Sequence, residues 1–208
     1  MKTIRIIIAI VALSIFAMSC TKDDEPTTVK PTSAEASFEN ITEVNILDAT
    51  ISGGNINVVT TPKSTESNIE VTANGTILDL KKLVLEMNIQ HNKPSDLSFT
   101  LVAPDGTESL FVKRVGVGDF WYFANRKLRF SASFSDVLPS GSSIIAGNYK
   151  ESQGIGAFAT PLLLPIFSTF RDSNITGTWK LKATDSRNTI TGKIKSWKLI
   201  FEAGALNQ

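Results

Sequence analysis

Apolar and polar residues alternate along much of the chain with a period of two, the period of a half-buried β-strand. The alternation is clearest in residues 83–90 and 97–102, where every second residue is Leu, Met, Ile or Phe. The same pattern predicts further strands at residues 56–60, 68–73, 127–134, 178–183 and 193–201. No sustained stripe of helical period competes with it, so the pattern predicts an all-β protein.

Turn-forming residues separate these strands. Between the strand at 97–102 and the apolar run at 109–112 stands Ala103-Pro104-Asp105-Gly106-Thr107, where Pro presets φ and Gly tolerates a positive φ. This segment predicts a tight hairpin. Many short strands with regular turn signals are typical of an antiparallel sandwich or barrel.

Residues 139–170 are the least readable part of the chain. A Gly-rich portion is followed by an apolar run from Pro161 to Phe167. Structureless loops of this length are uncommon in compact domains, so we expect some of the segment to pack. The apolar run is either a core or edge strand or an exposed contact patch for a partner.

The first residues have the layout of a secretory signal. Lys2 and Arg5 precede an apolar run at residues 6–17. A helix needs about 20 apolar residues to cross the hydrocarbon core, so this run is too short for a permanent span. We expect residues 1–19 to be a signal peptide that takes no part in the fold.

The chain's single cysteine, Cys20, follows small residues at positions 17 and 19. This arrangement resembles the bacterial lipobox, in which the cysteine is lipidated and becomes the first mature residue. Next come Lys22, Asp23 and Asp24, which resemble the export signal of surface lipoproteins in the Bacteroidetes group. The alternatives are an ordinary secretory signal followed by an idle thiol, and a solvated charge run. Lipidation of Cys20 predicts stable attachment to the outer membrane, facing the cell surface, because each buried methylene contributes about 0.8 kcal/mol.

Residues 20–37 contain almost no apolar side chains, so they cannot bury enough surface to offset the entropy lost on ordering. We expect this segment, which begins with the lipidated cysteine, to be a flexible tether. Residues 38–208 are long enough to bury a single core, and we expect them to form one β-sandwich domain.

The composition excludes several classes of function. The formal net charge is +1, and removal of residues 1–19, which hold two cations and no acid, leaves 19 bases against 20 acids, or −1. This balance gives no basic surface for nucleic acid. One Cys and one His cannot supply an internal disulfide or a structural zinc site. Asn40, Asn74 and Asn174 each begin an Asn-x-Thr pattern, and we interpret them as turn and cap residues because a lipobox marks a bacterial protein.

Four local patterns occur in a fixed order. They are His91 to Leu97 after a strand, Ala103 to Thr107 in the next turn, Gly177 to Asp185 opening a late strand, and Gly192 to Leu199 near the end of the chain. Together they resemble the P domain, also called the P/Homo B domain, of kexin- and furin-like proprotein convertases and of secreted bacterial subtilisin-like peptidases. The resemblance spans about residues 67–201, and Gly147 to Lys150 is similar to a further Gly-x-Tyr element of the family.

The resemblance implies an antiparallel jelly-roll β-sandwich of about eight strands, of the galactose-binding-like kind, which agrees with the period-two pattern. Trp179 and Trp197 lie in the two late patterns. We interpret them as large core residues, because a buried Trp contributes much apolar area when its N–H has a partner. The alternative is a platform on which a sugar stacks.

The family is associated with serine endopeptidases, yet a subtilisin-like peptidase needs Asp, His and Ser on a separate α/β domain. We find no pattern of such a domain here. The only histidine, His91, lies beside Asp96 inside the P-domain pattern, and we interpret it as a turn contact with a nearby carboxylate or backbone group. The sequence therefore predicts a protein that is not an enzyme.

Calcium is the ion that the resemblance favours. Asp96 and Asp185 fall at loop positions where P-domain carboxylates recur, and Asp172 is a third candidate ligand. Hard cations prefer such oxygen ligands, but the dense acidic loop of an EF-hand is missing. Turn capping by these aspartates is the alternative.

These observations predict a noncatalytic, lipid-anchored cell-surface P-domain protein that acts as a binding or stabilising module. One alternative is an accessory or regulator of a subtilisin-like peptidase in trans, and another is a carbohydrate-binding surface lipoprotein. Trp121, Tyr122 and Phe123 bear on the last alternative. If exposed they are candidate glycan contacts, and if buried they belong to the core at a strand end.

Overall fold

The computed structural model describes residues 33–53, 59–116, 123–139, 144–154, 163–188 and 190–208, with the side chains of residues 123–125 left out. All of these residues fall in one compact unit, Thr32–Gln208. The predicted signal peptide and most of the predicted tether lie outside the described residues. Among the described residues, no helix has the length and apolar character needed to cross a membrane.

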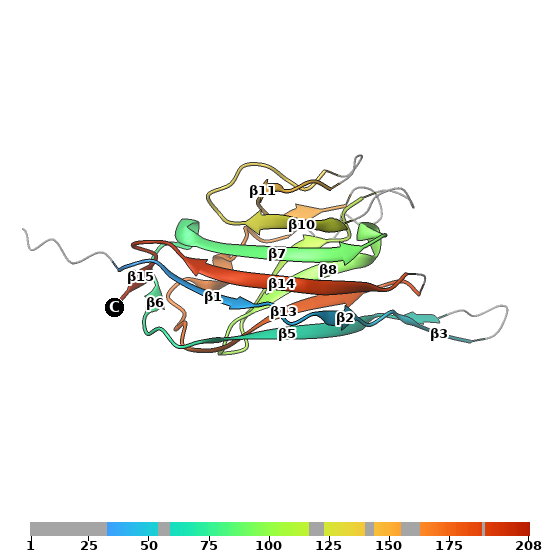
Figure 1. Cartoon of the computed structure of the whole chain (residues 1–208), viewed down its shortest axis with the longest axis horizontal. Helices are drawn as coiled ribbons and strands as arrows, with labels where there is room; N and C mark the ends of the chain where they lie inside the picture. Colours follow the sequence, from blue (N-terminus) through green and yellow to red (C-terminus); the bar gives the residue numbers. More distant parts are fainter. Residues whose placement is uncertain (1–32, 54–58, 117–122, 140–143, 155–162, 189) are drawn as a thin grey trace, which may run out of the picture. The chain divides into compact units, whose positions relative to one another are not determined.

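Two sheets form the body of the domain (Figure 1). The order of strands in the first sheet is β1 (Ala36–Asn40), β14 (Gly192–Phe201), β7 (Leu83–His91), β10 (Phe123–Phe130) and β11 (Gly147–Tyr149), and β2 (Val44–Ile46) also pairs with β14. The order in the second sheet is β12 (Ser152–Gln153), β9 (Glu108–Lys113), β8 (Leu97–Val102), β13 (Gly177–Asp185) and β5 (Lys63–Val71).

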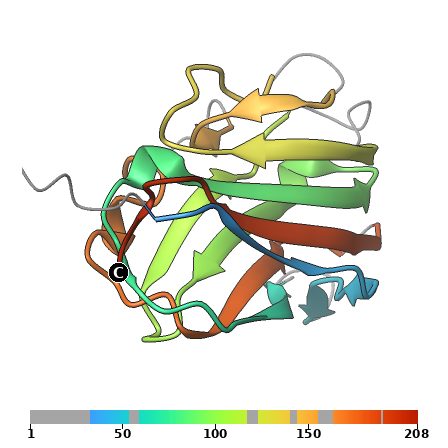
Figure 2. The same cartoon turned by 60° about the vertical axis from the view of Figure 1, so that its left-hand side comes forward.

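Two small ribbons complete the strands. They are β3 (Thr50–Ser52) with β4 (Val59–Thr61), and β6 (Thr76–Ile77) with β15 (Leu206–Asn207). Single 3₁₀ turns are formed by η1 (Leu80–Lys82), η2 (Pro94–Asp96) and η4 (Ser168–Phe170). Figure 2 shows the two main sheets stacked face to face. The predicted all-β sandwich is therefore confirmed.

Alternation of buried and open positions explains why these residues form strands. In β13 and β5 every second side chain is buried toward the other sheet, and the residues between face outward. The predicted hairpin at Ala103 to Thr107 is also present, because Ala103 N–H donates to the Thr107 carbonyl over 2.9 Å and Gly106 has a φ of 85°.

The structure differs from the prediction in the bounds of β5, predicted at 68–73 and found at Lys63–Val71, and in three other places. The strand predicted at 127–134 ends at Phe130, because the chain turns at once, with the Phe134 N–H donating to the Ser131 carbonyl over 3.2 Å. The apolar run ending at Phe167 forms no strand within residues 163–170, where Ile166 is buried and Leu164 is exposed. Two pairs, β10 with β11 and β9 with β12, are parallel, because a long connection returns the chain before each second strand.

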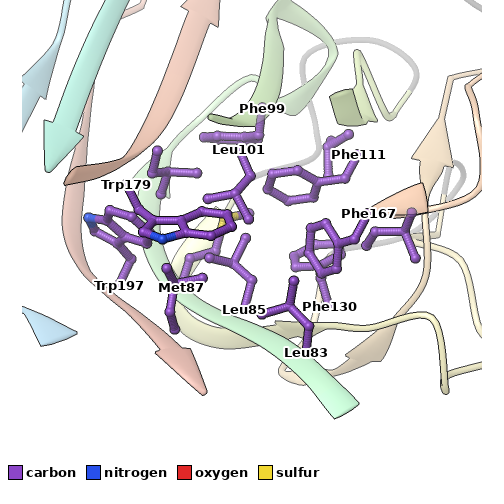
Figure 3. Packing of buried hydrophobic residues seen from close by; sticks show 14 of the residues in the cluster. Leu83, Leu85, Met87, Phe99, Leu101, Phe111, Phe130, Phe167, Trp179 and Trp197 are labelled. Carbon is purple, nitrogen blue, oxygen red and sulfur yellow. The ribbon is translucent and has the colours of Figure 1, made fainter. Parts of the chain in front are cut away.

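The core lies between the two sheets, and Figure 3 shows its large side chains gathered there. Trp179 and Trp197 are exposed by 0% and 1%. Trp179 Nε1 donates to the Ile175 carbonyl over 2.8 Å, and Trp197 Nε1 donates to Ser67 Oγ over 2.9 Å. Both indoles are thus buried with their N–H groups satisfied, which confirms their predicted place in the core and excludes sugar stacking.

Candidate functional site

The ends of β13 define the two ends of the sandwich. At one end, Asp185 is paired with Lys63, which follows β4, and at the other end Gly177 is paired with Val71. A strand of nine residues is about 26 Å long at 3.3 Å per residue. We call the first the arm end, after the β3–β4 ribbon that we call the arm, and the second the amide end, after the side chains described below.

His91, the last residue of β7, is buried at the arm end. The Lys93 N–H donates to its Nδ1 over 3.1 Å, and its Nε2 lies 2.9 Å from the Ile190 carbonyl oxygen. Because Nδ1 is an acceptor, the proton of the neutral ring is on Nε2, which donates to Ile190. His91 therefore joins the turn after β7 to the turn between β13 and β14.

These contacts decide what His91 can do chemically. A general base needs a ring nitrogen that reaches a substrate proton. Both nitrogens of His91 are occupied by backbone groups, and the ring is 0% exposed. The predicted contact with a backbone group is thus confirmed, and the arrangement does not present His91 to a substrate.

Asp185 is buried beside His91, with its Oδ2 3.4 Å from His91 Nε2. Its Oδ1 accepts a hydrogen bond of 2.9 Å from the Arg187 backbone N–H. Among the described residues, Oδ2 accepts no hydrogen bond. Asp96 lies at the same end, because its carbonyl accepts a hydrogen bond of 2.9 Å from the Ser186 N–H.

Arg114 brings positive charge to this cluster. Its Nε donates to the Ser95 carbonyl over 2.9 Å, and its backbone has a φ of 50°. Burial is the largest cause that lowers the pKa of Arg114, and the charge of Arg187 lowers it further, whereas Asp96 and Asp185 raise it. The cluster is therefore a set of opposed charges that fixes the loops at the arm end.

A hollow of about 450 Å³, the arm hollow, opens beside His91. It is lined by Asn45 to Asp48, Gln90 to Asn92 and Thr191 to Lys193. A Cβ atom on Gly192 would lie 2.4 Å from His91 Cδ2 and 2.5 Å from the Gln90 carbonyl oxygen. Only glycine lets β14 begin this close to β7, so the wall of the hollow depends on it.

The arm extends from the same end, at the right of Figure 1. All the residues of β3 and β4 are exposed. Leu47 at the base of the arm is 55% exposed, Ile51 is 52% exposed and Val59 is 57% exposed. Exposed apolar side chains gathered on a projecting ribbon are typical of a contact surface.

The amide end carries a second hollow, of about 720 Å³, which we call the amide hollow. Its lining consists of Thr72, Ala73, Asn74, Gly75, Thr76, Asn174, Thr176, Asn207 and Gln208. No side chain in this lining is charged or aromatic. The walls come from three segments that are far apart in the sequence.

Backbone contacts hold these three segments together. Thr76 and Asn174 form a bridge, and the Ile175 N–H donates to the Gly75 carbonyl over 3.0 Å. Asn207 pairs with Thr76 in the β6–β15 ribbon. Gly75 has a φ of 136°, a conformation that favours glycine.

The structure separates the candidate calcium ligands. Asp96 and Asp185 lie at the arm end, but Asp172 lies at the amide end, where its N–H donates to the Ile77 carbonyl over 3.1 Å. The length of β13 stands between them. Within the described part of the chain, no group of three or more His, Cys, Asp or Glu side chains is placed to hold a metal ion.

Other predicted site residues lie outside the described part of the chain. They are Cys20, Lys22, Asp23, Asp24, Trp121 and Tyr122. Phe123 begins β10, but its side chain is not described. The lipid anchor, the export signal and the aromatic ligand contacts therefore stay predictions.

The amide hollow was not predicted, although its asparagines carried a signal. Asn74 and Asn174 each begin an Asn-x-Thr pattern that the sequence assigned to turns. The turn assignment is confirmed for Asn174, whose Oδ1 accepts a hydrogen bond of 2.9 Å from the Thr176 N–H. What the sequence did not indicate is that the two turns line one hollow, because a contact between residues 100 apart is set by strand pairing.

Comparisons with known proteins test the predicted resemblance to the P domain. Residues 137–201 match the family model of the proprotein convertase P-domain. No curated protein matches the chain. A crystal structure of a serine protease of Aeromonas sobria has a TM-score of 0.36 and 15% identity, over 83% of this chain and 28% of that one. A crystal structure of the Aeromonas sobria serine protease and chaperone complex has a TM-score of 0.36 and 17% identity, over 82% of this chain and 27% of that one.

The family match includes the late patterns that begin at Gly177 and Gly192 and the Gly-x-Tyr element at Gly147. The earlier patterns, at 91–97 and 103–107, precede it. The predicted resemblance to the proprotein convertase P-domain is therefore confirmed over residues 137–201, which are less than half of the chain.

Proposed function

We propose that this chain is a noncatalytic, lipid-anchored module that associates with a subtilisin-like serine peptidase. The match of residues 137–201 to the P-domain carries this proposal, because that domain is a noncatalytic domain associated with proprotein convertases. The peptidase would be a separate chain at the outer membrane, and this domain would bind or stabilise it in trans.

The arm end is the docking surface in this proposal. Leu47, Ile51 and Val59 are exposed there, and burial of apolar side chains is the main source of affinity in protein interfaces. The end also lies away from the point where the N-terminal segment joins the domain. Ser33, the first described residue, binds the other end, since its carbonyl accepts a hydrogen bond of 2.8 Å from Gly204 N–H.

The membrane anchor in this proposal is Cys20, which follows the predicted signal peptide. A clickable fatty acid fed to the source cells should label the wild-type chain and leave the Cys20→Ala variant unlabelled. Equal labelling of the two chains would refute lipidation at Cys20. This result is independent of any peptidase.

Crosslinking of the tagged mature protein in outer-membrane extracts, followed by mass spectrometry, tests the partner. We expect a subtilisin-like serine peptidase to be crosslinked and to lose activity faster on heating when this chain is removed. Leu47→Glu should abolish both effects, because it places a charge in the contact.

Leu78→Glu is the matched control for that variant, since Leu78 is 57% exposed but precedes η1, near the amide end. It should leave the crosslink intact. Recovery of no serine peptidase, or equal loss with both variants, would contradict the proposal.

A further inference from the structure

The amide hollow differs in chemistry from every other surface described above. Its side chains are those of asparagine, glutamine and threonine with one alanine, and none of them carries a charge or an aromatic ring. Its volume, about 720 Å³, falls inside the range of ~300–1,000 Å³ typical of ligand sites. A hollow of this size with an uncharged polar lining restricts what can bind there.

Most ligand classes do not fit this lining. A phosphate, a carboxylate or nucleic acid requires a cation, and no side chain of the lining is cationic. A metal ion requires several oxygen ligands such as carboxylates, and the one carboxyl group here is the main-chain carboxyl group of Gln208. A peptide or an apolar small molecule requires apolar anchors, and Ala73 is the single apolar side chain in the lining. A neutral ligand with many hydroxyl groups remains, since each hydroxyl both donates and accepts a hydrogen bond.

The polar groups are held in place before any ligand arrives. The Asn174 Oδ1 accepts a hydrogen bond of 2.9 Å from the Thr176 N–H, which fixes the amide plane and so the direction of its NH₂ group. The Thr176 hydroxyl donates to the Ala73 carbonyl over 2.8 Å, so its oxygen is fixed as an acceptor. Preorganised groups lose little entropy on binding.

The frame around these groups is also rigid. Gly75 passes so close to the C-terminal segment that a Cβ atom there would lie 3.0 Å from the Asn207 carbonyl oxygen. The bridge between Thr76 and Asn174 joins the two turns that carry the asparagines. Three separate segments are therefore held at fixed spacing around the hollow.

From these observations we propose that the amide hollow is a binding site for a neutral saccharide. Asn174 donates to sugar hydroxyls through its NH₂ group, and Asn74 and Thr176 supply further hydrogen bonds. This site stands apart from the docking surface proposed for the arm end, and the inference does not depend on a peptidase partner.

The test uses purified chain lacking residues 1–19, with Cys20 replaced by Ser so that it stays soluble. The probes are xylohexaose, mannohexaose, maltohexaose and galactohexaose, with hexagalacturonate as the charged probe. Binding is measured by saturation-transfer NMR and by calorimetry. We expect at least one neutral hexasaccharide to bind and the galacturonate not to bind, because its carboxylates would be desolvated without a partner.

Asn174→Asp tests the location of the site. The new carboxylate keeps the oxygen that accepts from the Thr176 N–H, so the turn is retained, but the NH₂ donor is lost. We expect affinity for the neutral saccharide to fall by about tenfold or more, the equivalent of one or two hydrogen bonds. Asn74→Asp should have the same effect.

Asn92→Asp is the matched control, since Asn92 is an exposed asparagine that lines the arm hollow instead. It should leave the affinity unchanged. The proposal is overturned if no neutral hexasaccharide binds, or if Asn174→Asp binds as tightly as the wild type. Loss of binding in Asn92→Asp alone would place the saccharide at the arm end, and this result would also overturn the proposal. None of these results bears on the crosslink to a peptidase, so the two proposals fail separately.

Discussion

The two ends of the sandwich achieve rigidity by different means. At the arm end, polar and charged side chains are buried, and loop backbone contacts both ring nitrogens of His91 and the Oδ1 atom of Asp185. At the amide end, backbone contacts hold the loops, and side chains such as Asn174 and Thr176 stay exposed. Buried polar groups stabilise the fold through contacts with their neighbours, whereas exposed polar groups on a fixed backbone are accessible to a ligand.

This difference between the two ends affects which residues are interpreted as functional. A buried His beside a buried Asp suggests chemistry, but here both ring nitrogens of His91 contact loop backbone, and one oxygen of Asp185 accepts a hydrogen bond from the Arg187 N–H. Asparagines in turns are not by themselves evidence of a binding site, yet at the amide end they line the amide hollow, which is larger than the arm hollow. Mutations at the arm end should therefore cost stability, and mutations at the amide end should cost much less.

Gly192→Ala should have the largest effect. The new methyl group would collide with the His91 ring and with the Gln90 carbonyl, and neither can move without disturbing β7. We expect the free energy of unfolding, measured with urea, to fall by about 3 kcal/mol. A loss below about 1 kcal/mol would show that the arm end accommodates the added methyl group, and would contradict the proposed difference in rigidity between the two ends.

His91→Leu comes next. Leu has a comparable volume, so the main effect is that the half-buried Lys93 N–H and Ile190 carbonyl lose their partner. We expect a loss of about 2 kcal/mol in the same urea measurement. Asn92→Leu, at an exposed neighbour, is the control and should change stability little. Equal stability of the two variants would argue against a structural role for the buried ring.

Gly75→Ala measures the amide end. Its φ of 136° is unfavourable for alanine, and the methyl group would touch the Asn207 carbonyl. We expect a loss of about 1 to 2 kcal/mol. Gly106→Ala, at φ 85° with nothing near the added methyl, separates backbone strain from crowding. A loss larger than that of Gly192→Ala would reverse the comparison.

The smallest effect concerns the exposed charges near the arm hollow. Hydrogen bonds from Lys195 and Lys193 lower the pKa of Glu43 below its ordinary value of 4.5. A lowered folded-state pKa gives a stabilisation that is present above the unfolded value and is lost as pH falls through the folded value. An NMR titration should therefore show the Glu43 midpoint below 4.5 and moving upward in Lys195→Gln. An unchanged midpoint in that variant would contradict the assignment.

The strands were predictable because burial in a sheet repeats every two residues, so a local pattern contains the information. The place where a strand ends was less predictable. Residues 127–134 keep alternating past Phe130, yet the chain turns at Ser131. Its carbonyl accepts a hydrogen bond from the Phe134 N–H, and its hydroxyl donates to the Lys81 carbonyl, 50 residues away. The alternation of apolar and polar residues contains neither contact.

The candidate site was harder to predict for the same reason. Asp96 and Asp185 share an end and Asp172 does not, because register along β13 decides the end at which each loop falls. His91 was expected to contact a nearby group, and the contact with Lys93 is local. Its contacts with Asp185 and Ile190 depend on strand pairing across about a hundred residues, as does the joining of Asn74 to Thr176.

Because β1 pairs with β14, the first strand of the domain depends on a strand near the end of the chain. Ser33 accepts a hydrogen bond from the Leu206 N–H, 173 residues away, and Ala36 lies opposite Phe201. As the ribosome makes the chain, β1 and β7 emerge long before β14, the strand that lies between them. Until β14 arrives, both strands present unpaired edges, which invite association with other chains. The last long strand is thus the one that pairs both of these edges, and a chain cut short before Gly192 would leave β1 and the adjacent edge of β7 without this partner.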